Sequence, residues 1–237
     1  MRETDTELGY LARPDQDAHP GVVMIHDVWG LSDHTRDLAR RLAGEGFAVL
    51  ALNLYRRHGE VCIDDPGRWM RELSDPQVLA DVQTGVDFLA ASPATGSGRV
   101  GVTGFCMGGM YALLAACECR GVSACVSYYG LLSHAHGILH SERGPDPERK
   151  PRQPLDAAAD LRCPLLACFG DRDEFVPMAD IERLRGRLAG ADPPADVVIY
   201  PGAGHAFMND TRPDAYRPEA AADAWGRMLE FFRKHLG

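Results

Sequence analysis

The sequence predicts an α/β fold in which helices cover both faces of a mostly parallel sheet. Short apolar runs rich in β-branched residues recur along the chain, and segments whose apolar residues return every three or four positions lie between them. Such alternation of strand and helix favours a doubly wound sheet. The 237 residues are expected to form a single domain, residues 1–237, because α/β folds of this size build one core and no linker is visible.

Six runs are expected to form strands and five segments to form helices. The strand candidates are apolar without alternation, which is typical of strands buried on both faces. They cover residues 21–25, 47–52, 99–105, 124–129, 164–169 and 195–200, and the helices cover residues 35–44, 75–91, 107–117, 178–188 and 218–235. Ligands of such sheets bind beyond the carboxyl ends of the strands. The residues that follow each strand are therefore the candidates for a site.

The composition narrows the classes of function. Hydrophobic residues make up 45% and charged residues 25% of the chain, as in folded globular proteins. The net charge of -9 disfavours nucleic acid as a partner, since phosphates are bound by clustered Lys and Arg. The N-terminus is charged and no run of about 18 apolar residues occurs, so we expect a cytoplasmic protein without membrane association.

Seven cysteines are an odd number, and Cys106, Cys163 and Cys168 lie inside apolar runs. Reduced thiols are therefore expected rather than a disulfide framework. Cys117 and Cys119 lie close together without a second pair of ligands, which disfavours zinc. We expect neither a metal nor a cofactor.

One polar stretch, residues 133–156, breaks the alternation of strands and helices. It follows a strand and is long for a connection inside a compact domain. Connections of this length are usually lids, binding loops or disordered segments. We expect an insertion that forms a loop or lid.

A strand, a sharp turn and a helix meet at residues 104–109, which read Gly-Phe-Cys-Met-Gly-Gly. This is the pattern of a nucleophile elbow with cysteine in the place of serine. Glycines flank Cys106 because side chains there would collide with the neighbouring strand and helix. The start of the following helix favours a thiolate, and the Met107 N–H is a natural oxyanion donor. The alternative is a glycine-rich turn with a merely buried cysteine.

The last two strand ends supply the partners that a nucleophile needs. His205 follows the last strand in a glycine-rich turn and suits a general base, although a surface histidine would fit the same position. Asp171 and Asp173 follow the preceding strand, and either carboxylate could orient the histidine. Nucleophile, acid and histidine occur in the order of α/β-hydrolase triads. The sequence therefore predicts a Cys-His-Asp triad.

The chain resembles the dienelactone hydrolase family over nearly its whole length. The motifs that carry the resemblance are residues 25–30, 104–109, 128–130, 170–177 and 204–207. The resemblance implies an α/β-hydrolase fold and a hydrolase of esters or lactones, of the carboxymethylenebutenolidase type. By position it also implies Asp173 as the triad acid and Val28 as the second oxyanion N–H donor.

Two features depart from the family pattern. Asp27 stands where the family has a glutamate that contacts the cysteine and helps to deprotonate it, so Asp27 could keep that role or cap the following turn. The family holds a substrate carboxylate with arginines, one of them four residues after the histidine. Asn209 stands there instead, and Arg212 lies three residues later. Arg68 and Arg71 lie in the region that could supply the other arginine. The candidate substrate contacts are therefore Trp29, Arg68, Arg71, Tyr128, Phe207 and Asn209.

The predicted reaction is attack of the Cys106 thiolate on an acyl carbonyl, followed by hydrolysis of the thioester. Because a thiolate is a good leaving group, the first intermediate yields products only when the departing oxygen is a weak base such as an enolate or phenolate. Activated esters and enol lactones fit this condition, and amides do not. The expected partner is a small ester or lactone, bound by a monomer or a small homo-oligomer.

Three other functions fit parts of the sequence. Glutamine amidotransferases also have a cysteine elbow, but their histidine is followed two positions later by a glutamate where Phe207 stands here. A small-molecule binding protein on a hydrolase fold would keep the pocket and tolerate loss of the triad. A metal site could use His134, His136 and His140, but no strand-held carboxylate accompanies them. The intact triad favours the hydrolase.

Overall fold

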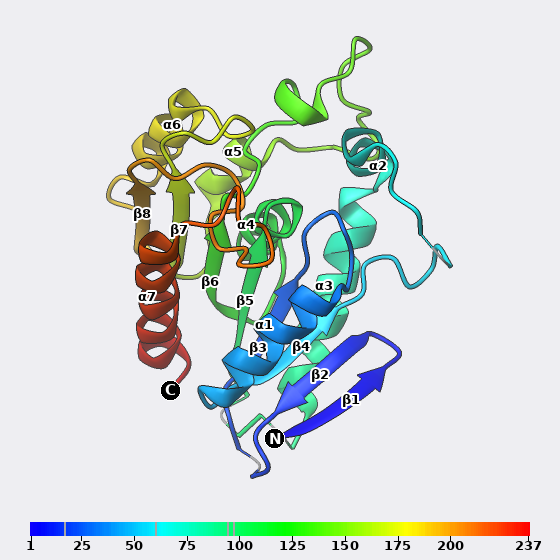
Figure 1. Ribbon diagram of the computed structural model, residues 1–237, viewed down its shortest axis with the longest axis vertical. Coiled ribbons are helices and arrows are strands. Elements are labelled where there is room, and N and C mark those ends of the chain that lie inside the picture. Colours follow the sequence, from blue (N-terminus) through cyan, green and yellow to red (C-terminus); the bar gives the residue numbers. More distant parts are fainter. Residues whose placement is uncertain (17, 60, 94, 97) are drawn as a thin grey trace.

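The structure is a computed structural model that describes residues 1–16, 18–59, 61–93, 95–96 and 98–237. In these ranges an eight-stranded sheet forms the centre, in the order β1-β2-β4-β3-β5-β6-β7-β8 (Figure 1). The strands are β1 (Arg2–Thr6), β2 (Gly9–Arg13), β3 (Gly21–Ile25), β4 (Ala48–Leu52), β5 (Val100–Phe105), β6 (Val122–Tyr128), β7 (Leu165–Gly170) and β8 (Ala195–Tyr200). Strands β3 to β8 run parallel, and each predicted strand lies within two residues of its expected ends.

Helices cover both faces of the sheet (Figure 1). They are α1 (Asp33–Gly44), α2 (Pro66–Glu72), α3 (Asp75–Ala91), α4 (Met107–Glu118), α5 (Pro154–Ala157), α6 (Met178–Leu188) and α7 (Pro218–Leu236), with 3-10 turns η1 (Gly137–Leu139) and η2 (Ala158–Asp160). Helices α1 and α7 pack on one face, and α3, α4 and α6 on the other. The predicted fold class is confirmed. None of the helices in the described ranges has the length and apolar character that a membrane crossing needs.

The sequence did not predict the hairpin β1–β2, which adds two antiparallel strands beside β4. Strand β1 is exposed along most of its length and consists of polar residues, so it carries no apolar pattern. Helix α2 was also missed, because its seven residues are too short for a clear helical period. Asp65 begins this helix by accepting a hydrogen bond from the Arg68 N–H at 2.9 Å.

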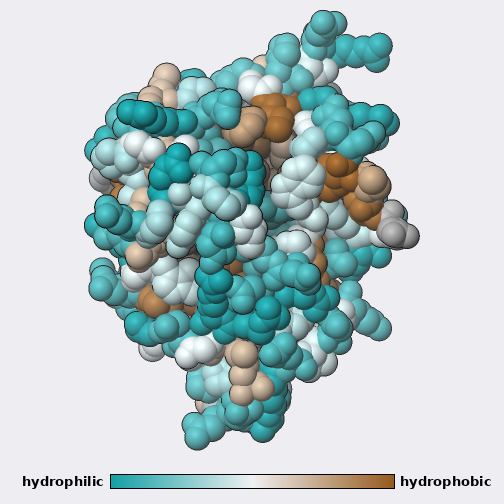
Figure 2. Space-filling view, viewed as in Figure 1, coloured by the Kyte–Doolittle hydropathy of each residue, from teal (hydrophilic) through white to brown (hydrophobic). Residues whose placement is uncertain are grey.

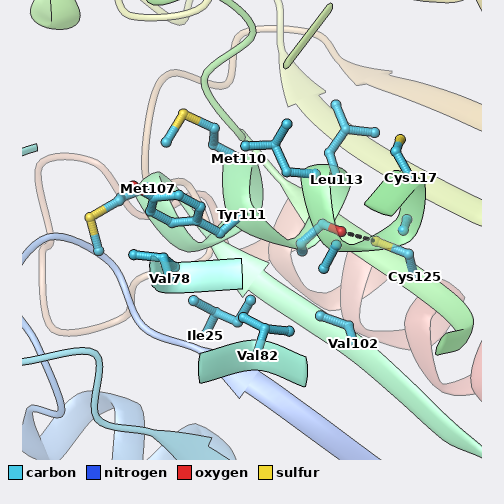
Figure 3. Packing of buried hydrophobic residues seen from close by; sticks show 14 of the residues in the cluster. Ile25, Val78, Val82, Val102, Met107, Met110, Tyr111, Leu113, Cys117 and Cys125 are labelled. Atoms are coloured by element: carbon cyan, nitrogen blue, oxygen red, sulfur yellow. Dashed lines mark hydrogen bonds between the residues drawn. The ribbon is translucent and has the colours of Figure 1, made fainter. Parts of the chain in front are cut away.

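Helix α4 is buried nearly all round, between the sheet and α3. Figure 3 shows Tyr111 of α4 beside Val78 and Val82 of α3, above Ile25 of β3. The Cys125 thiol of β6 donates to the Ala112 carbonyl at 3.2 Å. Each large buried side chain contributes about 1.5 to 3 kcal/mol of stability, so this packing fixes the start of α4, where Cys106 lies.

The polar segment 133–156 contains η1 and the start of α5 and projects at the top of Figure 1. It is attached to the core by Lys150, whose Nζ lies 2.6 Å from Oδ1 of the buried Asp75 and 3.2 Å from the Tyr111 hydroxyl. The η1 turn packs against α2. The face of the molecule in Figure 2 is mostly hydrophilic, with hydrophobic side chains in small separate patches.

Candidate active site

Cys106 occupies a strained turn between β5 and α4. Its φ of 56° and ψ of -117° lie in a region that residues with a side chain rarely adopt. The turn is held because the Cys106 N–H donates to the Tyr128 carbonyl at 3.0 Å, and the Met110 N–H donates to the Cys106 carbonyl at 3.1 Å. Strain that regular structure maintains on both sides is typical of a functional residue.

Two glycines allow the elements around Cys106 to meet. A Cβ on Gly104 would lie 2.1 Å from the Gly108 carbonyl oxygen, and a Cβ on Gly108 would lie 2.2 Å from the Ile25 carbonyl oxygen. Neither position tolerates a side chain without movement of the backbone. The loop that follows β3 is thereby brought beside the nucleophile turn.

His205 and Asp173 lie after β8 and β7 and contact each other. Nδ1 of His205 lies 2.8 Å from Oδ2 of Asp173, and these side chains are 11% and 0% exposed. Oδ1 of Asp173 accepts hydrogen bonds from the Phe175 and Val176 N–H groups, at 2.8 and 3.1 Å. The carboxylate is therefore fixed, and Nδ1 of His205 is the nitrogen that holds a proton toward it.

Asp171, the alternative acid, has a different partner. Its Oδ1 accepts a hydrogen bond from the Gly202 N–H at 2.7 Å and so braces the turn that precedes His205. The side chain of Asp171 is part of the loop scaffold, whereas Asp173 reaches the imidazole. The structure thus brings together the three side chains that the resemblance selects.

The charge state of His205 depends on its two neighbours. Burial lowers its pKa, but the negative charge of the Cys106 thiolate and hydrogen bonds with Asp173 and Cys106 outweigh burial and raise the pKa to about 10. Tyr129 and Phe175 flank the ring, with centroids 5.0 and 4.8 Å from its own. At neutral pH a pKa of about 10 favours the imidazolium form of His205.

A small cavity of about 40 Å³ lies beside Cys106 and opens to solvent. Of the residues that the sequence selected, Asp27, Val28, Trp29, Cys106 and Asn209 line it. Trp29 is 53% exposed and stands at the rim. These five come from the β3 loop, the elbow and the segment after β8, so the cavity forms at the carboxyl ends of the strands.

Asp27 caps the turn after β3, as one of the two expectations for this position has it. Its Oδ1 accepts a hydrogen bond from the Trp29 N–H at 2.9 Å, which caps the turn. Burial raises the pKa of Asp27, an effect that the Trp29 N–H and the positive charges of His205 and Arg212 oppose. The carboxylate also lines the cavity with Cys106.

Two backbone N–H groups near Cys106, those of Val28 and Met107, are the oxyanion donors that the sequence predicts. Val28 and Met107 are buried, and neither N–H donates a hydrogen bond to any residue in the described part of the chain. Buried N–H groups without a partner are rare in native proteins. The two predicted oxyanion donors are therefore available to a ligand.

The other four candidate substrate contacts do not line this cavity. Tyr128 is fully buried, and its hydroxyl donates to the Ala224 carbonyl of α7 at 3.0 Å. Phe207 is buried behind Tyr129, with ring centroids 5.4 Å apart. Arg68 pairs with Glu72 at 3.0 Å, and Arg71 donates to the Ile138 carbonyl at 2.9 Å.

The cavity also contains residues outside the candidate set, among them Tyr129, His34, Leu38 and Arg212, the arginine noted three residues after Asn209. Tyr129 directly follows β6, so the rule of inspecting strand ends could have found it. Tyr128 was chosen instead, although side chains alternate along a strand and its ring points into the core. His34 and Leu38 lie on α1, where no motif indicates a site.

The histidines of the polar segment are directed to different partners. Nε2 of His134 lies 3.4 Å from Asp75, and Nε2 of His136 lies 2.7 Å from Asp180. Nδ1 of His140 lies 3.0 Å from the Ala135 carbonyl. Among the described residues, no group of three or more His, Cys, Asp or Glu is arranged to hold a metal ion.

Known proteins resemble this chain over nearly its whole length. The model of the dienelactone hydrolase family matches residues 8–236. A protein of Escherichia coli (strain K12) named "Putative carboxymethylenebutenolidase" is 35% identical over 243 aligned positions, which cover 98% of this chain and 84% of that protein. A protein of Bradyrhizobium sp named "Probable 2-oxo-3-(5-oxofuran-2-ylidene)propanoate lactonase" is 33% identical, over 98% of this chain and 91% of its own.

A solved structure has the same fold. The crystal structure described as "Putative Dienelactone Hydrolase from Klebsiella pneumoniae subsp. pneumoniae MGH 78578" aligns with a TM-score of 0.82 and 34% identity. The alignment covers 95% of this chain and 92% of that one. The chain therefore belongs to the dienelactone hydrolase family and is a hydrolase, as its motifs predicted.

Proposed function

We propose that the protein hydrolyses activated esters or lactones through a thioester on Cys106. The observation that carries the proposal is the arrangement of Cys106, His205 and Asp173 around a strained turn, next to the free N–H groups of Val28 and Met107. A binding protein has no need of a strained cysteine whose thiolate is paired with a histidine.

In the first half of the reaction, the Cys106 thiolate attacks the acyl carbon and the carbonyl oxygen becomes negative. The Val28 and Met107 N–H groups would stabilise this oxyanion. Collapse of the intermediate breaks the bond to the departing oxygen, which takes a proton from the His205 imidazolium. Asp173 keeps the ring in place while its charge changes.

In the second half, a water molecule attacks the thioester and gives a proton to His205. A second oxyanion forms and collapses, and it releases the acid and the Cys106 thiolate. The proton on His205 then balances the restored thiolate. Asp27 lies on the cavity wall and is proposed to assist the thiol when substrate is present.

We further propose that the substrate carries a carboxylate beside the scissile bond. Arg212 lines the cavity, and the other basic side chain among the described lining residues is His34, whose pKa burial lowers. Nη2 of Arg212 lies 3.5 Å from the exposed Asp214, and Asp27 lines the same cavity. The names of the two relatives contain a carboxymethylene and a propanoate group. Arginine binds carboxylates through paired hydrogen bonds.

The experiment combines intact-protein mass spectrometry with hydrolysis rates for aryl esters, enol lactones and dienelactone. Wild type is compared with Cys106→Ala and with Cys62→Ala, a control at an exposed thiol. The proposal expects turnover and an acyl adduct in wild type and in Cys62→Ala, and neither in Cys106→Ala. Full activity of Cys106→Ala would overturn it, and binding without turnover in wild type would favour the small-molecule binding protein.

A further inference from the structure

We propose that His26 is a positioning residue that sets the direction of the Val28 N–H and thereby prepares the oxyanion site. The inference rests on the proposed function, because it takes the Val28 N–H as an oxyanion donor. His26 does not line the cavity of Cys106 in the described structure, so its action passes through the backbone.

His26 is fully buried at the end of β3, where its ring accepts one hydrogen bond and donates another. Its Nε2 accepts from the Leu54 N–H at 3.2 Å, so Nδ1 must carry the proton when the ring is neutral. That Nδ1 lies 2.5 Å from the carbonyl oxygen of Asp27 and donates to it. Burial lowers the pKa of His26 to about 4, which keeps the ring neutral and this tautomer in place.

The hydrogen bond from His26 to the Asp27 carbonyl is decisive because that carbonyl belongs to the peptide that carries the Val28 N–H. The Asp27 carbonyl and the Val28 N–H belong to the same planar trans peptide and point in opposite directions. Anchoring the oxygen on one side therefore aims the hydrogen to the other side. The Gly30 N–H also donates to the Asp27 carbonyl, at 3.3 Å.

Rotation of this peptide would be costly in two ways. Both hydrogen bonds to the Asp27 oxygen would be lost, and a carbonyl would face the position where the substrate oxygen becomes negative. A hydrogen bond at the carbonyl also polarises the peptide and strengthens its N–H as a donor. His26 thus contributes to both the direction and the strength of the donor.

The adjacent peptide is held by other groups, which provides a control. The Tyr55 hydroxyl donates to the Val28 carbonyl at 2.8 Å, and the Trp29 N–H of that same peptide donates to Asp27 Oδ1 at 2.9 Å. Tyr55→Phe therefore loosens the same loop without removing a bond from the Asp27–Val28 peptide. Tyr55 and His26 are in ring contact, with centroids 4.8 Å apart.

Two amide replacements separate the two bonds of His26. The amide of asparagine lies at the distance of Nδ1 from the backbone, and that of glutamine lies at the distance of Nε2. His26→Asn can therefore still donate to Asp27, and His26→Gln can still accept from Leu54. The readouts are kcat and KM on an activated ester and, separately, the rate at which iodoacetamide alkylates Cys106, followed by peptide mapping. Alkylation is a displacement at saturated carbon and forms no oxyanion.

We expect His26→Gln to lower kcat by about 10- to 100-fold, somewhat less than complete removal of an oxyanion donor. KM and the alkylation rate of Cys106 should stay unchanged in that variant. His26→Asn should keep most of the wild-type kcat, and Tyr55→Phe should lose clearly less than His26→Gln. If His26→Gln does not fold, His26→Asn still carries the test, because it retains the bond to Asp27.

The proposal is overturned if folded His26→Asn loses as much kcat as His26→Gln. If His26→Gln cannot be made, a loss of kcat in His26→Asn of the size expected for His26→Gln overturns it as well. It is also overturned if alkylation of Cys106 slows in parallel with kcat, since His26 would then act on the thiolate or on the fold. Failure of the proposed function appears elsewhere, as retained turnover in Cys106→Ala. The two failures are therefore distinguishable.

Discussion

Gly108 in the first turn of α4 lies so close to Ile25 at the end of β3 that an added Cβ would be 2.2 Å from the Ile25 carbonyl oxygen. This contact between two backbones sets the separation between the nucleophile turn and the loop that carries Val28. Both proposed oxyanion donors depend on it, since one lies on each side of the contact.

The first prediction concerns this contact. Gly108→Ala should lower the free energy of unfolding by about 1 to 3 kcal/mol, because the backbones must move apart, and should also lower kcat. Gly186→Ala is the matched control, since it lies in α6 with open space where its Cβ would be. That control should be neutral or more stable by about 0.5 to 1 kcal/mol. Urea unfolding measures the free energy of unfolding of both variants, and equal changes in the two would contradict the prediction.

The second prediction separates the two acids. Asp173→Asn should lower kcat by about 100-fold or more, because the imidazolium loses its charged partner and the ring its fixed orientation. Asp171→Asn should change kcat by less than about threefold, since Asp171 contacts a backbone N–H rather than His205. Steady-state rates on an activated ester measure kcat in both variants, and an equal loss of kcat in the two would count against Asp173 as the orienting acid.

The third prediction concerns pH. The pKa of His205 is raised from 6.5 to about 10 in the folded protein, so the folded state binds more protons than the unfolded chain between these values. The stability from this group is complete below pH 6.5 and is lost as the pH rises through 10. Cys106→Ser removes the thiolate charge and should lower the pKa of His205. Titration of the His205 ring by NMR measures this, and an unchanged value would show that the thiolate is not the cause.

The fourth prediction concerns the carboxylate of the substrate. Arg212→Met should raise KM by about 10- to 100-fold for a lactone with a carboxylate, since a charged hydrogen bond contributes about 1.5 to 3 kcal/mol. KM for a neutral aryl ester should not change. Arg68→Met serves as the control, because Arg68 pairs with Glu72 on α2. The assignment fails if Arg212→Met affects the charged and the neutral substrate equally.

The fifth prediction concerns the attachment of the polar segment to the core. Lys150→Met should lower the free energy of unfolding by about 3 to 5 kcal/mol, because Asp75 keeps a buried charge without its cation. Arg149→Met, at a half-exposed ion pair 3.9 Å from Asp146, should cost less than about 1 kcal/mol. Thermal or urea unfolding compares the two, and similar small losses would mean that the Lys150 pair contributes little.

Local sequence was sufficient for the elements that position the site. The buried central strands are mostly apolar, and α3 and α6 were predicted with their observed ends. The elbow was recognisable because a strained turn between strand and helix demands glycines at set positions around Cys106. The hairpin β1–β2 was not, since the edge strand β1 consists of polar and mostly exposed residues and so shows no apolar pattern.

The choice among chemically similar neighbours was left to the tertiary structure. From the residues alone, Asp171 and Asp173 were equivalent, and it is the fold that points Asp173 at His205 and Asp171 at Gly202. The fold likewise places Tyr129, and not Tyr128, at the cavity. A sequence determines which residues follow each strand, because apolar periodicity is local. Which of their side chains meet depends on backbone directions fixed by contacts across the whole sheet.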